Sequence, residues 1–239
     1  MPRKSTVPAK SAEDVTSSHR GSKSVARSAE DLASLALKAC LIARDAAFNV
    51  RDLLTNSSRM AFLAIKDCEK ELDLIERHID ERLPEAITRV NESRARQLLS
   101  VLKSTTDLER IGDLVMSVAL RVQARTDRIL PSDSRQLVDM ATVLRDMLDL
   151  MHQGFSNLDL DCARKVLQMD KDIDRICHTL FQKHLAETVT QGDTSGFEIL
   201  LMAQALERAG DHTTNLAEDL FSLIEGRSLR HLPKKKASN

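Results

Sequence analysis

A short acidic motif that occurs twice constrains the fold of this chain more than any other feature. The segment LERIGD at 108–113 returns as LERAGD at 206–211, an offset of 207 − 109 = 98 residues. Upstream of each copy, EKELD at 69–73 matches DKDID at 170–174, an offset of 170 − 69 = 101 residues. Two motifs that recur in the same order at nearly the same distance indicate an internal duplication. The small difference between the two offsets fits a change in the length of one connection.

Both halves have the composition of long helices. Between Ser28 and Glu225 the only prolines are Pro84 and Pro131, and the chain contains neither Trp nor Tyr. Ala, Leu, Arg, Glu and Asp predominate, a composition typical of long helices rather than sheets. Apolar periodicity predicts six helices, at 28–55, 58–82 and 92–128 in the first half and at 132–157, 159–188 and 195–225 in the second. We therefore expect an all-α protein of two tandem homologous three-helix bundles, with six long antiparallel helices joined by short loops.

Composition also divides the chain into segments. Residues 1–27 mix Ser, Lys, Arg and Pro without periodicity, and we expect a disordered basic extension there. The first repeat is expected at 28–130 and the second at 131–226, separated by a Pro-Ser-Asp turn. Residues 227–239 form a basic C-terminal tail. Such a tail is either a solvated segment or a contact for a lipid surface or an acidic partner.

Cysteine usage and charge indicate a cytoplasmic protein that does not bind nucleic acid. The four cysteines are far apart and form no C-x-x-C pair, so we expect small buried hydrophobes in a reducing compartment. No apolar run approaches the roughly 20 residues that span a bilayer, and the N-terminus has no apolar signal-peptide region. The formal charge is −1, and no basic groove with interleaved aromatic residues is evident.

The repeated motifs place pairs of acids four residues apart. This spacing projects both carboxylates from one helix face, where like charges repel. A single pair is usually just solvated, but four pairs in equivalent places are a more specific signal. The pairs are Glu69/Asp73, Glu109/Asp113, Asp170/Asp174 and Glu207/Asp211.

The helical position of the pair in the third predicted helix favours a bound cation. Glu109 and Asp113 share a strip with Leu102, Met116 and Leu120. A strip that carries large apolar groups is expected to meet another helix or subunit, where carboxylates without a partner would be costly. A cation would remove that cost. The pair in the preceding helix continues into further acids, so a solvated face explains it equally well.

Ligand chemistry and two glycines refine this prediction. Oxygen ligands suit hard cations, or iron in multinuclear clusters, better than a structural zinc site of Cys and His. His212 projects about 100° away from Asp211 and is expected to be a polar neighbour rather than a ligand. Gly112 and Gly210 lie inside predicted helices, where glycine is unfavourable. Their recurrence beside the acids indicates the close approach of another backbone or of a ligand.

These residues resemble the PhoU family. Its hallmark is a repeated Leu-Glu-Arg-Ile-Gly-Asp helix preceded by an acid-x-x-x-Asp helix. The second copy here continues as DHTTNLAE at 211–218, close to the family's Asp-His-Ala-Thr-Asn-Ile-Ala-Glu run. The resemblance covers residues 28–226. The first copy departs from the pattern, with Ser117 and Leu120 where the second has Asn215 and Glu218, which predicts a poorer first site.

The resemblance implies two three-helix bundles whose acidic motifs hold iron or zinc clusters at the surface, with manganese or magnesium as further candidates. It implies a cytoplasmic homodimer that is accessory to the phosphate-specific ABC transporter and reaches the membrane through its partners. It also implies negative regulation of the phosphate regulon through a sensor histidine kinase. The metal candidates that it implies are Glu69, Asp73, Glu109, Asp113, Asp170, Asp174, Glu207 and Asp211.

Other functional classes fit the sequence less well. Ferritin-like di-iron enzymes carry Glu-x-x-His pairs, but Gly112 and Gly210 stand three residues after the repeated glutamates. No Ser or Cys lies in a recognisable nucleophile turn, so we expect no enzymatic activity. Two alternatives remain open. One is a PhoU-domain adaptor for a different ion transporter, and the other is a helical scaffold without bound metal.

Overall fold

The computed structural model describes residues 12–125, 128–191 and 196–226, and these residues form six helices without a strand. The helices are α1 (Ala12–Asn56), α2 (Arg59–Ile87), α3 (Glu92–Ala124), α4 (Pro131–Asn157), α5 (Leu160–Gln191) and α6 (Phe197–Glu225). The expected all-α fold of two homologous three-helix bundles is confirmed. None of the described helices is long and apolar enough to cross a membrane.

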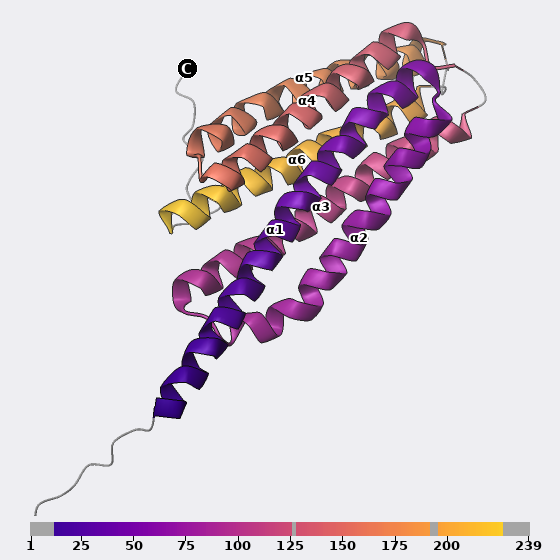
Figure 1. Ribbon diagram of the computed structural model, residues 1–239. Helices are drawn as coiled ribbons and strands as arrows, with labels where there is room; N and C mark the ends of the chain where they lie inside the picture. The colour runs from indigo at the N-terminus through magenta and orange to yellow at the C-terminus, as the bar shows by residue number, and fades with distance from the viewer. Residues whose placement is uncertain (1–11, 126–127, 192–195, 227–239) are drawn as a thin grey trace, which may run out of the picture.

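The helices divide into two bundles that share an inner layer. Helices α1 to α3 form the first bundle and α4 to α6 the second (Figure 1). The bundles meet where α1 packs on α4 and where α3 packs on α6. Among the described helices, α2 contacts only α1 and α3, and α5 contacts only α4 and α6. Each repeat therefore has one outer helix, and that outer helix carries its upstream acidic motif.

The two largest differences from the predicted helix boundaries lie at the start of α1 and at the end of α2. Helix α1 begins at Ala12, so the expected irregular segment is helical from that residue on. The stretch between Ala12 and Ser28 contains no proline and one glycine, so nothing in it stops a helix that the first bundle anchors. Residues 1–11 and the tail at 227–239 lie outside the described residues.

The predicted end of the second helix at residue 82 is wrong, because α2 continues through Pro84 to Ile87. Pro84 lies close to the helix end and removes a single backbone hydrogen bond. Its neighbours Leu83 and Ala86 are buried against the bundle, which offsets that cost. The chain then turns to Asn91, whose side chain accepts a hydrogen bond from the Arg94 backbone N–H at 3.0 Å and caps α3.

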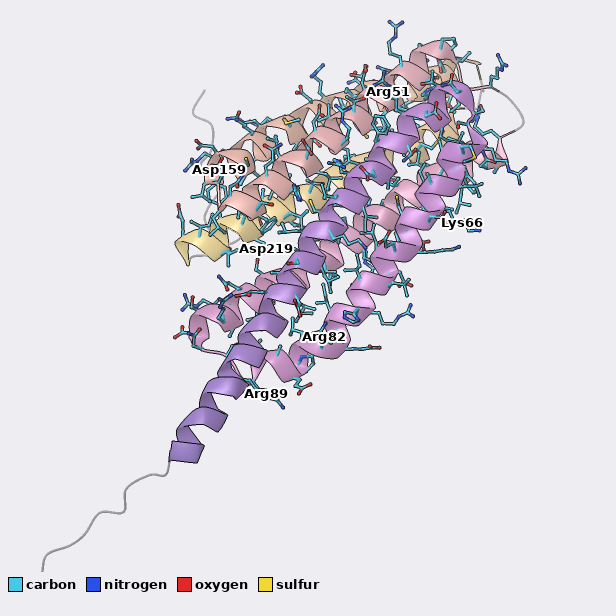
Figure 2. The ribbon with its side chains drawn as sticks, in the orientation of Figure 1. Arg51, Lys66, Arg82, Arg89, Asp159 and Asp219 are labelled. Carbon is cyan, nitrogen blue, oxygen red and sulfur yellow. The ribbon has the colours of Figure 1, made fainter. Side chains whose placement is uncertain are left out.

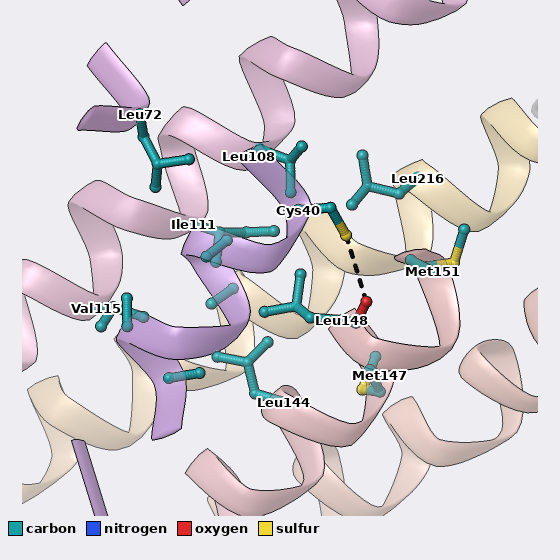
Figure 3. Packing of buried hydrophobic residues seen from close by; sticks show 14 of the residues in the cluster. Cys40, Leu72, Leu108, Ile111, Val115, Leu144, Met147, Leu148, Met151 and Leu216 are labelled. Atoms are coloured by element: carbon teal, nitrogen blue, oxygen red, sulfur yellow. Dashed lines mark hydrogen bonds between the residues drawn. The ribbon is translucent and has the colours of Figure 1, made fainter. Parts of the chain in front are cut away.

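A single apolar core runs through both repeats. In Figure 3, Leu108 and Ile111 of α3 lie near Leu148 of α4 and Leu216 of α6. The Cys40 thiol of α1 donates a hydrogen bond to the Leu148 carbonyl oxygen at 3.3 Å. Burial raises the pKa of Cys40 to about 12, so this thiol stays neutral. Charged side chains lie on the outside, among them Lys66 and Arg82 of α2 and Arg89 in the turn that follows it (Figure 2).

Candidate functional site

The four acidic pairs lie on two helical hairpins. Helix α2 packs on α3 in the first repeat, and α5 packs on α6 in the second. Each contact therefore brings the upstream motif of a repeat against its downstream motif. The fold explains why the motifs are duplicated together, since each of them supplies half of an acidic cluster.

In the second repeat all four predicted acids interact. Asp170 and Glu207 are partly buried, while Asp174 and Asp211 are exposed. Burial, followed by the charges of Asp174, Asp211 and Glu207, raises the pKa of Asp170 to about 6. Burial also raises the pKa of Glu207, and the charges of Asp211 and Asp174 raise it further. We define these four residues as the repeat-two cluster.

Gly210 lets this cluster form close to the α6 backbone. A Cβ at this position would lie 3.1 Å from the Asp170 Oδ1 atom and 3.2 Å from the Ile173 Cδ1 atom. In the first repeat, a Cβ at Gly112 would lie 2.6 Å from the Leu72 Cδ1 atom. The close approach predicted at both glycines is present, and the approaching groups are side chains of the preceding helix rather than a backbone.

In the first repeat the acids gather one turn further along α2. Burial is the main cause that raises the pKa of Glu109. The charges of Asp113, Glu76 and Asp73 raise this pKa further, in decreasing order of effect, and the charge of Arg110 lowers it. We define Asp73, Glu76, Glu109 and Asp113 as the repeat-one cluster.

The predicted acid Glu69 stands apart from this cluster. It is partly buried, but it is not one of the carboxylates whose charge raises the pKa of Glu109. Asp73 is half exposed and its Oδ2 atom pairs with the Arg77 guanidinium at 2.7 Å. Of the predicted α2 pair, only Asp73 therefore contributes to the raised pKa of Glu109.

Glu76 is the member of the site that the sequence motif missed. Burial raises its pKa, the Thr106 side chain opposes the shift by hydrogen bonding, and the charge of Asp80 raises it. The signal that could have found it is the acidic strip of α2, which continues from Asp73 to Glu76. The equivalent position in the second repeat, 76 + 101 = 177, is Cys177.

Cys177 occupies the equivalent place beside the repeat-two cluster. It is buried, and burial together with the charges of Glu207 and Asp174 raises its pKa to about 11. An open hollow of about 620 Å³ lies over it, lined also by His178 and Phe181. The two repeats thus place a carboxylate and a thiol at matching positions next to their acids.

The match to a known protein family has the same twofold repeat. The family model of the PhoU domain matches the chain twice, at residues 25–122 and 137–220. The chain belongs to the PhoU family. Both matched segments contain both of their repeat's acidic motifs.

Individual PhoU proteins resemble the chain over most of its length. The phosphate-specific transport system accessory protein PhoU homolog of Xylella fastidiosa strain 9a5c is 31% identical over 215 residues, covering 78% of this chain and 89% of that protein. The Pseudomonas putida protein of the same name is 27% identical over 177 residues, covering 72% of this chain and 69% of the relative. The crystal structure of PhoU from Pseudomonas aeruginosa superposes with a TM-score of 0.76 at 24% identity, over 84% of this chain and 99% of that one.

The PhoU clusters contain suitable donors for a cation, but these donors do not converge. In the described part of the chain, no group of three or more His, Cys, Asp or Glu side chains is arranged to hold a metal ion. One buried oxygen in each cluster nevertheless has no hydrogen-bond partner among the described residues: Glu109 Oε2 in repeat one and Asp170 Oδ1 in repeat two. The Arg110 Nε atom forms an ion pair with Glu109 Oε2 at 3.5 Å, so Asp170 Oδ1 is the less compensated of the two. Buried carboxylate oxygens of this kind are costly unless they are neutralised. The donor set fits a hard cation once the exposed aspartates rotate toward these oxygens.

His212 does not belong to the repeat-two cluster. Its Nδ1 atom lies 2.7 Å from Oδ1 of Asp107 on α3, and the Asn215 side-chain amide donates to the same oxygen at 3.1 Å. His212 is therefore the polar neighbour that the sequence predicted. Together with Asn215 it joins α6 to α3, so Asn215 of the PhoU motif connects the two repeats instead of completing the acidic cluster.

Proposed function

We propose that this protein regulates phosphate uptake as an accessory to a phosphate-specific ABC transporter. The observation that carries the proposal is the duplicated PhoU domain, with an acidic cluster on each repeat. Relatives from Xylella fastidiosa and Pseudomonas putida that span both repeats are named phosphate-specific transport system accessory proteins. The protein acts by binding partners, and no catalytic step is assigned to it.

The proposed role places the protein in the cytoplasm as a homodimer. There it relays the state of the transporter to a membrane sensor histidine kinase and represses the phosphate regulon. Exposed apolar side chains on the outer helix α2 support a role in protein contacts: Met60 is 75% exposed and Leu74 is 59% exposed. Large apolar groups on a charged outer face are typical of surfaces that dock a partner or a second copy.

Metal binding is the second part of the proposal. Iron or zinc, with manganese or magnesium as further candidates, would be held by Glu109, Asp113 and Asp73 in repeat one. Asp170, Asp174, Glu207 and Asp211 would hold it in repeat two, and Glu69 would enter only if its side chain turned toward α3. A bound cation would neutralise the clustered carboxylates and tie the outer helix of each repeat to its neighbour. The Asp170 Oδ1 atom, which is buried without a hydrogen-bond partner in the described structure, supports this role.

The absence of a converged ligand group among the described residues favours one alternative, a scaffold whose acids stay solvated. Thermal unfolding with and without divalent cation separates the two. If metal binds, millimolar Mn²⁺ or Zn²⁺ raises the Tm of the wild-type protein and the Asp170→Asn/Glu207→Gln variant loses part of that rise. An equal rise in both, or none in either, supports the scaffold.

Deletion of the gene tests the regulatory role. In phosphate-rich medium the deletion strain should express alkaline phosphatase constitutively, and the wild-type gene should restore repression. The Glu85→Gln variant, altered at an exposed acid of α2 outside both clusters, should restore it equally. Unchanged alkaline phosphatase in the deletion strain would overturn the phosphate role and leave an adaptor for another ion transporter.

A further inference from the structure

A cavity lies at the junction of the two repeats. Its volume is about 290 Å³, and its walls come from α1 and α3 of the first repeat and from α6 and the C-terminal end of α4 in the second. Most of the lining is apolar and includes Leu37, Leu98, Phe155 and Leu216. Cavities of this size with a few convergent polar groups are typical of sites for small ligands.

Small residues on two facing helices leave this space open. Helix α1 contributes Ala33 and Ala36, and α3 contributes Ser104. The residue of the second repeat that matches Ser104 is Met202, because 202 − 104 = 98, and Met202 is fully buried. A long apolar side chain thus stands in the second repeat where the first has a serine and a cavity.

Two hydroxyl groups line the cavity without partners. Ser104 is 5% exposed, and its Oγ atom has no hydrogen-bond partner within the described structure. The Oγ atom of Ser100, one turn earlier on α3, is also shielded and also lacks a partner there. Buried hydroxyls without partners are costly, so a guest that supplies an oxygen acceptor or donor gains affinity from them.

The charges around the cavity are balanced. Arg94 and Glu30 lie at its solvent edge and pair with each other at 3.3 Å. The Cys40 thiol at the inner end is neutral, since burial raises its pKa to about 12. No described lining residue offers an uncompensated charge to a guest, so an ionised group would pay a desolvation cost inside.

We propose that this cavity binds a medium-chain aliphatic molecule that carries one uncharged oxygen group, an alcohol or a carbonyl. The oxygen pairs with the hydroxyls of Ser100 and Ser104, and the chain lies against the alanines of α1 and the leucines of α6. A cavity of 150 Å³ accommodates benzene, so twice that volume takes a chain of about eight to ten carbons. The guest touches both repeats and stabilises their junction.

Titration with 1-octanol tests this proposal on the full chain. Calorimetry should show saturable binding of one molecule per chain, with a parallel rise in Tm. Octanoate, ionised at neutral pH, should bind at least about tenfold more weakly because its carboxylate has no cation inside the cavity. The Ser104→Met variant copies the residue of the second repeat, fills the cavity and should abolish binding.

Two further variants distinguish the contribution of the Ser104 hydroxyl from that of the cavity volume. Ser104→Ala keeps the space and should weaken 1-octanol binding about three- to tenfold, the usual effect of one lost hydrogen bond. Ser34→Met makes the same change as the filling variant at an exposed serine of α1 and should bind normally. Absence of saturable binding, unchanged binding in both Ser104 variants, or equal binding of octanoate would overturn the proposal. These outcomes are independent of the proposed role in phosphate uptake.

Discussion

The two repeats share one fold but build their acidic clusters differently. In the second repeat, the first acid of the upstream motif, Asp170, lies over Gly210 and meets both acids of α6. In the first repeat, Leu72 fills the space beside Gly112, and the acids of α3 meet Glu76 and Asp73 instead. The acids therefore gather at different turns of the outer helix in the two repeats, although the helices are arranged in the same way.

This difference separates two roles of a duplicated motif. The glycine and the apolar residue that packs on it, Leu72 or Ile173, hold the hairpin together in both repeats. The residue at one matching position next to the acids of α6 or α3 differs, and it is Glu76 in one repeat and Cys177 in the other. Packing is common to the repeats, whereas ligand chemistry is specific to each.

The largest expected effect tests the common packing. Leu72→Ala and Ile173→Ala each remove a fully buried side chain and should each lower the free energy of unfolding by about 3 kcal/mol. Because one core joins the repeats, urea denaturation should show a single transition in both variants. Leu74→Ala, at an exposed position of α2, should change little. Two separate transitions would contradict the shared core.

The next effect concerns Asp170. Its pKa rises from 3.8 to about 6 in the folded protein, so the folded state binds more protons than the unfolded chain between these values. Stability therefore falls as the pH rises from about 4 to 6 and stays lower above that range. In chelator, Asp170→Asn should stabilise the protein at pH 8 by about 1–2 kcal/mol, after allowance for solvent screening, and should do nothing below pH 4.

Glu69→Gln is the matched control, because Glu69 occupies the same motif position in the first repeat. It should change stability by less than about 0.5 kcal/mol at any pH, since Glu69 lies outside the repeat-one cluster. Denaturation curves between pH 4 and pH 8 measure both variants. Equal gains from the two substitutions would remove the difference between the repeats.

Exchange of the two cluster residues sharpens the comparison of ligand chemistry. Thiolates favour zinc, whereas carboxylates suit manganese and magnesium. Cys177→Glu should therefore weaken Zn²⁺ binding relative to Mn²⁺ by about tenfold in the second repeat, and Glu76→Cys should do the reverse in the first. Competition titrations with both metals measure the ratio. If neither exchange alters it, positions 76 and 177 do not take part in binding.

The smallest expected effect lies at the contact between the repeats. His212→Ala removes one of the two α6 partners of Asp107 on α3 and should cost about 1 kcal/mol of unfolding free energy. Arg208→Ala, at an exposed position of the same helix, should cost less than about 0.5 kcal/mol. A loss no greater than that of the Arg208 variant would show that this hydrogen bond is not needed to join the repeats.

The sequence predicted the fold well because helical periodicity and the duplication are both local signals. It missed the continuation of α2 beyond Pro84 and the early start of α1, since tertiary packing decides whether a helix continues past a weak stop. The acids of the second repeat were predicted as a set and do interact. Glu69 and Glu76 were not distinguished, because a motif read along one helix does not reveal which turn faces the neighbouring helix.

The cavity lay beyond sequence reasoning for a different reason. Its walls come from four helices, and a serine in an α-helix gives no indication that its hydroxyl will be buried. Only the comparison of Ser104 with Met202, once both are placed in the fold, marks the position as unusual.

Metal content measured by mass spectrometry after dialysis against Mn²⁺ or Zn²⁺ tests the central claim most directly, that each repeat carries a carboxylate cluster neutralised by a cation. The account predicts that wild-type protein retains metal and that Glu109→Gln/Asp113→Asn and Asp170→Asn/Glu207→Gln each lose the share of one repeat. Wild-type protein without metal, or variants that retain all of it, would contradict the account.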